Sequence, residues 1–498
     1  MQDSLNLLAA KCEELGFTIS HTKTKAMSHT RSTPPTKMRL QGQDLDWVAT
    51  HRYLGVMVTR NNTCKAEIQH LKGKCRARNK VLKALSWRGM GASGRVIMSV
   101  YKSLVRSLID YASPALLNMT SNDAKGLETI QNEALRIALG APKWTKVDNL
   151  RSETQVPPLT QRINTVIANL LIKTAIRGHP DHLHTLLHNH REQGNQGRWF
   201  KRAVEALDSS GVTWGTLLTA AAPTEAQNAP PWETTCITTI INPPRKKKIL
   251  CAMAELQQEG FHTISAAQRA HTATYFTDGS TDPVTGRSGA AYVCKTDNGR
   301  AAVSAITTTA SARTTDFSSS TQTELAAIVM ALEHAYTYHC RNVLIATDSM
   351  TAIAAINKQD GENITQTRVI WKTARAIHNA GRSVTLAWIP SHVGISGNEE
   401  ADALAKRAAS DATVATVIPR TLNQLRGAVK AHAERQRQQE QHDQGSESVR
   451  WFRQIAAGCP PPARNFPSRL CEVVTYRIRL GYPYPWQLGF ATSEEETR

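Results

Sequence analysis

The chain has few features that would cross-link a small fold covalently or hold it in a membrane. Its nine cysteines are scattered over 498 residues and no two are spaced as Cys-x-x-Cys, which excludes a zinc knuckle and a redox-active dithiol. An odd number of cysteines without a pattern fits a reducing compartment. The most apolar stretch, residues 166–172, contains Asn169 and is far shorter than the ~20 residues that cross a bilayer. Four charged residues among the first 14 leave no signal-peptide core, so we expect an intracellular protein of the nucleus or cytoplasm without a membrane segment.

Acidic residues are scarce compared with basic ones. The chain has 41 Asp and Glu against 60 Lys and Arg, a formal charge of +19 and a pI of about 9.7. This excess favours a polyanionic partner such as nucleic acid, although lysine and arginine can also simply solvate helix surfaces. Residues 1–270 carry 36 basic and 20 acidic residues, whereas residues 271–412 carry 12 and 13 and residues 413–498 carry 12 and 8. A basic binding surface and a cluster of acids therefore belong to different parts of the chain.

The length allows about three domains, and the pattern changes three times along the chain. Residues 1–190 predict a helix over 4–16, strands over 17–20 and 52–58, and helices from about 64 onward. Residues 191–270 predict a linker, because they are rich in Ala and Pro over 220–231 and carry the basic run Arg245–Lys248 after two prolines. That run is either a solvated linker or a phosphate-contacting or nuclear-import signal. Residues 413–498 predict a polar helix over 421–442, a Pro-rich break at Cys459–Pro462 and an aromatic tail over 473–490, whose abrupt end suggests that a following segment has been lost.

Residues 271–412 predict a separate α/β domain, because strand and helix patterns alternate there. Apolar alternation predicts strands, and a spacing of three to four residues predicts helices. The expected order is βββαβααβα, which implies a mixed five-stranded sheet with helices on its faces. We expect Asn398 to cap the last helix. The expected strands are 272–277, 289–295, 301–307, 343–347 and 384–389, and the expected helices are 321–336, one after Ser349, one around 370–377, and 398–408.

Four acidic residues stand where these elements begin or end. Asp278 and Asp348 each follow a predicted strand, and the carboxyl ends of strands are where ligands of α/β sheets collect. Glu324 lies near the start of one helix and Asp402 in the first turns of another. Carboxylates that converge repel one another, and divalent cations relieve the repulsion. Taken singly, these residues are more often turn, cap or surface residues, so the prediction of a metal site rests on their combination.

A histidine in a Gly-rich loop, His392, precedes Asp402 by ten residues. With the acids it completes a set that resembles the type 1 ribonuclease H domain of non-LTR (LINE-like) retrotransposon polyproteins. The matching elements are Asp278-Gly279-Ser280, the helical Glu324, Thr347-Asp348-Ser349 and His-x-Gly-x-x-x-Asn-Glu-x-x-Asp from His392 to Asp402. The resemblance covers about 135 residues. The extra basic, Trp-containing helix of many cellular members has no counterpart after Asp348, where the chain continues into the polar loop 359–363.

The resemblance implies a reaction and a set of roles. Asp278, Glu324, Asp348 and Asp402 would hold two Mg²⁺ ions, with Mn²⁺ as the alternative, and His392 would be a mobile auxiliary. The reaction would be endonucleolytic hydrolysis of the RNA strand of an RNA–DNA hybrid, leaving 5′-phosphate and 3′-hydroxyl ends. Selection of RNA requires contacts to its 2′-hydroxyl groups. The predicted nucleic-acid contacts are Ser280, Thr281, Gln322 and Ser349.

The first 190 residues are similar to the distal end of a retrotransposon reverse transcriptase. The resemblance rests on residues 12–19 with Lys23-Thr24-Lys25, on Tyr53-Leu54-Gly55-Val56 as a primer-grip hairpin, and on 101–117 and 131–142 as thumb and connection. An unrelated helical domain is the alternative. No Tyr-x-Asp-Asp precedes residue 12, so we expect that the chain cannot polymerise DNA by itself, since polymerisation needs those metal ligands.

Two other functions remain open at this point. One is a catalytically inert remnant that binds nucleic acid, and the other is a different two-metal nuclease of the same fold, such as an integrase or exonuclease. The segment from His392 to Asp402 favours the ribonuclease H arrangement over the latter. The oligomeric state is not predicted by any pattern.

Overall fold

The computed structural model describes residues 2–28, 37–87, 91–177, 197–220, 236–242, 251–268, 272–296, 306–358, 363–442, 450–452, 454–455 and 466–482. The chain forms two compact units: residues 1–172, 186–214 and 426–498 make the first, and residues 173–185 and 215–425 make the second. The Ala- and Pro-rich stretch 221–231, the basic run Arg245–Lys248, the break at Cys459–Pro462 and the tail after 482 lie outside the described residues. None of the helices in the described ranges is both long and apolar enough to cross a membrane.

The second unit is built on a mixed sheet of six strands in the order β5-β10-β9-β6-β7-β8. The first four strands in this order run parallel, and β6, β7 and β8 form an antiparallel meander. The sequence predicts five strands, whereas the sheet has six. The sixth, β5, is an edge strand of four residues in the predicted linker, and only its pairing with β10 makes it a strand. The strands are β5 (Ile237–Ile240), β6 (Thr272–Thr281), β7 (Ser288–Thr296), β8 (Ile306–Thr314), β9 (Asn342–Thr347) and β10 (Ser383–Trp388).

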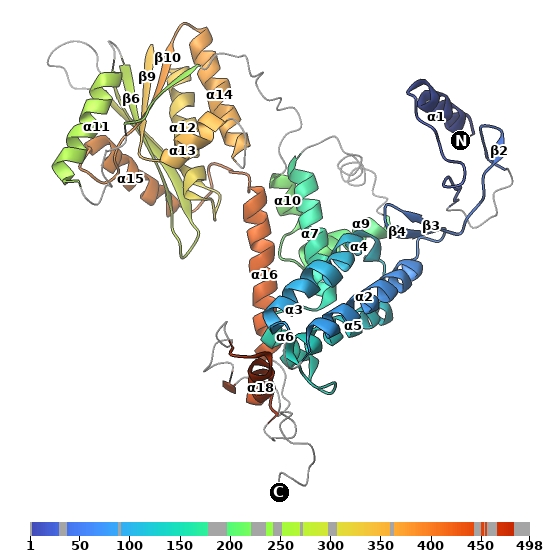
Figure 1. The fold of residues 1–498 in the computed structure, drawn as a ribbon. Coiled ribbons are helices and arrows are strands. Elements are labelled where there is room, and N and C mark those ends of the chain that lie inside the picture. The colour runs from blue at the N-terminus through green and yellow to red at the C-terminus, as the bar shows by residue number, and fades with distance from the viewer. Residues whose placement is uncertain are drawn as a thin grey trace. The chain divides into compact units, whose positions relative to one another are not determined.

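Helices cover both faces of this sheet (Figure 1). On one face lie α12 (Ser320–Thr337), α13 (Met350–Lys358) and α14 (Ile364–Asn379), and on the other lie α11 (Met253–Ala267) and α15 (Ser396–Ala409). Successive residues of β9 face opposite cores: Val343 and Ile345 pack with α12 and α14, whereas Leu344 and Ala346 pack under α11 and α15. Burial on both faces explains why β9 is apolar throughout rather than alternating with polar residues.

The predicted element order from β6 to α15 is confirmed, and two boundaries are wrong. Residues 301–305 of the strand expected over 301–307 lie outside the described residues, and β8 (Ile306–Thr314) ends seven residues later than expected. Its run of small polar residues has no apolar alternation to mark where the strand ends. The last helix begins at Ser396 with Ile395 as its N-cap, so Asn398 is not the cap. Its side chain instead turns toward Asp348.

The first unit is mostly helical. The helix expected over 4–16 is confirmed as α1, but residues 17–20 form no strand. The single strand expected over 52–58 is a hairpin, because Leu54 and Gly55 take positive φ values of 46° and 87° and turn the chain. The elements of or bordering this unit are α1 (Gln2–Glu14), β1 (Arg39–Leu40), β2 (Gln43–Asp44), β3 (Thr50–Tyr53), β4 (Val56–Thr59), α2 (Lys65–Leu85), α3 (Gly94–Val100), a π-helical turn (Tyr101–Arg106), α4 (Ser107–Leu116), α5 (Ser121–Leu139), α6 (Val147–Thr154), α7 (Leu159–Arg177), α9 (Arg198–Asp208), α10 (Trp214–Ala220), α16 (Leu422–His442) and α18 (Arg469–Arg479).

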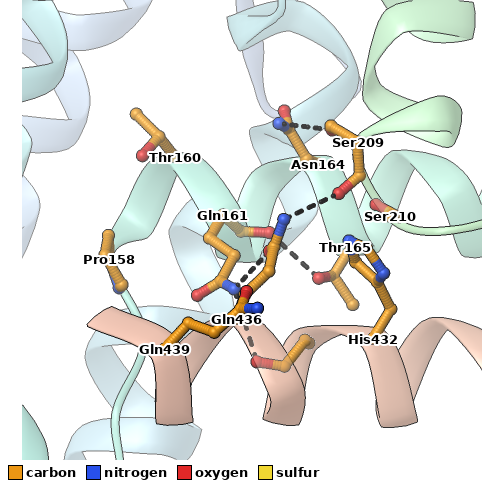
Figure 2. A pocket seen from close by; sticks show the side chains of 11 residues that line it. Pro158, Thr160, Gln161, Asn164, Thr165, Ser209, Ser210, His432, Gln436 and Gln439 are labelled. Carbon is orange, nitrogen blue, oxygen red and sulfur yellow. Dashed lines mark hydrogen bonds between the residues drawn. The ribbon is translucent and has the colours of Figure 1, made fainter. Parts of the chain in front are cut away.

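A polar pocket of about 420 Å³ lies in this unit between α7, α16 and the turn after α9. Figure 2 shows the side chains of Gln161 and Gln436 pointing toward one another. The Gln161 amide donates to Gln436 Oε1 at 2.8 Å, and Gln436 donates to the Ser209 carbonyl at 3.3 Å. The residues lining the pocket include amides, hydroxyls and His432 but no carboxylate, lysine or arginine. The pocket therefore lacks the acidic ligands that a magnesium site needs.

Candidate active site

The pairing of two parallel strands brings Asp278 and Asp348 together. Strands β6 and β9 run side by side with Thr277 opposite Thr347, so the residues that follow these two threonines occupy the same edge of the sheet. Strand β9 ends there, whereas β6 continues to Thr281 by pairing with β7 alone. Asp278 therefore lies within β6 rather than after it. The backbone N–H of Gly279 donates to Asp278 Oδ1 at 2.7 Å and helps to fix this carboxylate.

Helix α12 adds Glu324 to the same edge. Ser319 and Gln322 cap its first turn reciprocally, which fixes where the helix begins. The helix then passes so close to β6 that a Cβ atom on Gly279 would lie 2.4 Å from the Glu324 nitrogen. Only glycine allows this approach. Glu324 is 4% exposed as a result, and its carboxylate is directed at the two aspartates.

The three carboxylates of Asp278, Glu324 and Asp348 lie with ligand atoms within 4.8 Å of one another. Burial, and then the charges of Asp348 and Asp402, raise the pKa of Asp278 to about 7. Burial and the charges of Asp278 and Asp348 raise the pKa of Glu324 well above its usual value. Because the two groups lie side by side, the protons that they retain belong to the pair rather than to either residue alone. Without a cation, the cluster holds protons that isolated carboxyl groups would have lost.

The cluster fits a hard divalent cation. Glu324 Oε2 is shielded from solvent and has no hydrogen-bond partner, although a buried polar oxygen without a partner costs about 1–3 kcal/mol. A cation beside this oxygen would satisfy it and would remove the repulsion that raises the pKa values of the cluster. Mg²⁺ prefers carboxylate oxygens and keeps several waters, and this set offers only oxygen ligands. Asp278, Glu324 and Asp348 are therefore the residues that would hold it.

Asp402 belongs to a second, adjacent group. Its ligand atoms lie within 4.8 Å of those of His392 and Glu399, and its charge contributes to the raised pKa of Asp278. One turn along α15, the ammonium of Lys406 contacts Asp402 Oδ2 at 2.7 Å. The structure thus brings three of the four predicted carboxylates into one cluster and places the fourth beside it, paired with a lysine.

His392 lies at the solvent-exposed end of this second group. It is exposed and has a φ of 54°, and Gly394 nearby has a φ of 81°. The loop is fixed by Glu399, whose Oε1 accepts the Gly394 N–H at 3.2 Å. Glu399 lies within the motif from His392 to Asp402 but is not among the predicted site residues, since acidic residues are common at the start of any helix. Its signal was the spacing of three residues to Asp402, which places both on one helix face.

Asn398, which the sequence predicts only as a helix cap, is a further residue of the site. It is buried, its Nδ2 donates to Asp348 Oδ2 at 3.3 Å, and its Oδ1 has no hydrogen-bond partner. The indole N–H of Trp388 also donates to the Asp348 carbonyl, at 3.1 Å. Asp348 is half-buried and is oriented by both contacts, and Asn398 stands one turn before Asp402 on α15. This helix therefore contributes to both groups of ligands.

Replacing Asn398 by alanine is expected to lower the affinity for Mg²⁺ more than it lowers the stability of the metal-free protein. Without the amide, the Asp348 carboxylate loses a neutral donor that holds it in position, and partners of this kind change metal affinity or activity by about 10- to 100-fold. Titrating Mg²⁺ into the variant, with thermal shift as the measurement, should show this loss. Asn379→Ala, an exposed change at the end of α14, is the control. An unchanged Mg²⁺ response in Asn398→Ala would contradict the assigned role.

The four residues predicted to contact nucleic acid differ in how exposed their side chains are and in whether they already bond within the fold. Ser280 is half-buried next to Asp278. The Thr281 hydroxyl donates to the Ser318 carbonyl at 3.1 Å, and Ser349 Oγ accepts the Ala352 N–H at 3.2 Å as the cap of α13.

Gln322 is the exception among them, because its side chain is turned into the fold. It is 2% exposed. Its amide donates to the Pro419 carbonyl at 3.1 Å and accepts from Ser319 and Gln424 at 3.0 and 2.6 Å. The structure contradicts its prediction as a contact, because its amide groups are already bonded within the fold.

A family model of RNase H matches residues 270–410. These residues form an RNase H-like domain. The match includes every element from β6 to α15, whereas the edge strand β5 and the helix α11, which packs on one face of the sheet, precede it. Among solved structures, the domain is similar to the crystal structure of RNase H1 from the halophilic archaeon Halobacterium salinarum NRC-1, at 20% identity over 28% of this chain and 99% of that chain, with a TM-score of 0.23. The carboxylate cluster and His392 both lie within the RNase H-like domain.

Proposed function

We propose that this chain hydrolyses the RNA strand of RNA–DNA hybrids in a Mg²⁺-dependent reaction. The observation that carries the proposal is the cluster of Asp278, Glu324 and Asp348 at the edge of an RNase H-like sheet. Carboxylates are rarely buried together unless a cation or a proton offsets their repulsion. The RNase H family match makes an RNA–DNA hybrid the substrate that best fits this site.

Each residue of the site has a proposed role. Asp278, Glu324 and Asp348 would hold the cations, and Asp402, which is paired with Lys406 in this structure, would complete the set. When bound there, two Mg²⁺ ions, or Mn²⁺ ions, would activate the attacking water and stabilise the leaving oxygen. Asn398 orients Asp348, and His392, on the exposed loop, moves a proton to or from the reacting oxygens. Water adds to phosphorus as the bond to the 3′ oxygen breaks, which leaves 5′-phosphate and 3′-hydroxyl ends.

We also propose that residues 1–190 are the distal part of a retrotransposon reverse transcriptase. This proposal rests on the sequence resemblance of residues 12–25, 53–56, 101–117 and 131–142, and on the hairpin that β3 and β4 form around Leu54-Gly55. In this proposal the chain binds template or primer but does not extend it. Primer extension on a defined template is the direct test, and incorporation of nucleotides by the purified chain would disprove it.

A panel of labelled substrates tests the proposed specificity. The same RNA strand is supplied alone, in an RNA duplex and in an RNA–DNA hybrid, each with Mg²⁺, and the products are resolved by size and end chemistry. Cleavage of the RNA only in the hybrid, with 5′-phosphate products, is the expected result. Equal cleavage of the RNA duplex would contradict the substrate assignment. Binding of the hybrid without cleavage would favour the alternative, a catalytically inert nucleic-acid-binding remnant.

A further inference from the structure

The turn between α5 and α6 presents a tryptophan to solvent. Trp144 is 69% exposed, although tryptophan is among the most buried residue types on average. Lys143 and Lys146 on either side of it are exposed as well. Asp148 in the first turn of α6 is also exposed, so the turn from 140 to 148 has two lysines against one acid. The turn therefore combines a free aromatic ring with a positive charge on each side.

This turn is anchored, so the exposure of Trp144 is not that of a loose loop. The next residue, Thr145, is 3% exposed. Its hydroxyl bonds the Pro142 carbonyl at 2.8 Å and the Tyr482 hydroxyl at 2.7 Å, and its carbonyl accepts from Arg136 at 3.1 Å. One end of the turn is held in the same way, because Arg477 donates to the Gly140 carbonyl at 2.8 Å. A backbone fixed on both sides of Trp144 sets where the indole leaves the surface before any ligand arrives.

We propose that Lys143, Trp144 and Lys146 form a binding site for single-stranded nucleic acid. The indole stacks on one unpaired base, and the two ammonium groups contact the phosphates that flank it. Aromatic side chains in a basic setting bind single strands in this way, and every base offers a face to stack on. The excess of basic residues in residues 1–270, 36 against 20 acids, favours a polyanion here.

A duplex does not fit this site, because its bases are already stacked on one another. The RNase H-like domain takes a hybrid duplex in the proposed function, so the Trp144 site would bind a different part of the substrate: an unpaired overhang or a displaced strand. The site lies in the first compact unit and the carboxylate cluster in the second. Binding of single strands is therefore independent of the hydrolytic activity, and one proposal can fail without the other.

Fluorescence anisotropy with a labelled single-stranded oligodeoxynucleotide tests the proposal on the full chain, in EDTA so that hydrolysis does not occur. Trp144→Ala is expected to weaken binding about tenfold or more, as loss of one base stack does elsewhere. Trp144→Phe should retain most of the affinity. Trp87→Ala is the matched control, because Trp87 is also 69% exposed in the same unit. Affinity for a blunt DNA duplex should change little in all three variants.

The salt dependence gives a second measurement that does not rely on the aromatic ring. Changing Lys143 and Lys146 to glutamine should make the slope of log affinity against log salt about 1.4 less steep, at about 0.7 per phosphate contact on a single strand. Unchanged affinity in Trp144→Ala would overturn the proposal. Equal losses of affinity in Trp144→Ala and Trp87→Ala would overturn it too, because they would show that the oligonucleotide binds to any exposed indole. Circular dichroism melts confirm that each variant is folded, which is expected for changes to exposed side chains.

Discussion

Asp278→Asn is expected to abolish Mg²⁺-dependent hydrolysis and, without metal, to melt at a higher temperature than the wild type. Asp278 belongs to the cluster that would hold the cation, and a bound cation supplies several kcal/mol of transition-state stabilisation. Its loss corresponds to a decrease in rate of about a thousandfold or more. The carboxylate is also buried beside Asp348, so its removal relieves repulsion in the metal-free protein.

The gain in stability has a defined pH dependence. The pKa of Asp278 is raised from 3.8 to about 7 in the folded protein. Between these values the native state binds more protons than the unfolded state, so the free energy of unfolding falls as pH rises. The loss of stability caused by the ionised Asp278 carboxylate is therefore absent below pH about 4 and complete above pH about 7. An asparagine has no such penalty, and the variant should therefore exceed the wild type more at pH 8 than at pH 5.

Thermal melts in EDTA at the two pH values measure this difference. Glu333→Gln, an exposed change on the same helix as Glu324, serves as the control and should match the wild type in both stability and activity. A variant that melts below the wild type at pH 8 without metal would show that Asp278 stabilises the fold, which contradicts the electrostatic account of the cluster. Retention of hydrolysis by Asp278→Asn would contradict the assigned site.

The second large effect concerns the affinity for Mg²⁺, which is expected to rise steeply with pH up to about 7. Burial and neighbouring carboxylates raise the pKa values of both Asp278 and Glu324. A cation must displace the protons that these groups retain, and metal binding to protonated ligands releases protons. Displacing one proton makes the apparent affinity fall by about tenfold for each pH unit below the raised pKa.

Calorimetric titration of Mg²⁺ into the full chain at several pH values, in buffers with different heats of ionisation, measures both the affinity and the protons released. The expected result is release of at least one proton below pH about 7, and less release as the pH rises further. Glu333→Gln should keep this behaviour, and Asp278→Asn should lose most of it. An affinity that does not vary between pH 6 and 8 would show that the cluster is already ionised without metal.

Much of the candidate site was predictable from the sequence because it depends on strand order. Asp278 and Asp348 directly follow the registered pair Thr277 and Thr347 of two neighbouring parallel strands, and both strands have clear apolar patterns. Glu324 follows from the helix that crosses them. A residue at the end of a strand or in the first turn of a helix has its position fixed by the backbone, which the apolar pattern predicts.

What the sequence did not predict depends on side-chain direction. Asn398 was interpreted as a helix cap, because a local hydrogen bond is the commonest use of an asparagine at a helix start. Its bond to Asp348 joins residues 50 positions apart. The pairing of Asp402 with Lys406 depends on rotamers, and the strand character of β5 depends on its pairing with β10. Gln322 was wrongly predicted as a contact for the same reason, because its direction is set by Pro419 and Gln424.

The most direct test of the central claim is the rate of cleavage of a labelled RNA–DNA hybrid by the wild type and by Asp348→Asn, each with and without Mg²⁺. Asp348→Asn keeps the size and shape of the side chain while removing the charge that the cluster contributes to the cation. We predict that the wild type cleaves the hybrid only when Mg²⁺ is present, and that the cleavage rate of the variant is about a thousandfold or more lower. Cleavage that persists in Asp348→Asn, or that proceeds equally in EDTA, would contradict a metal-dependent active site at this edge of the sheet.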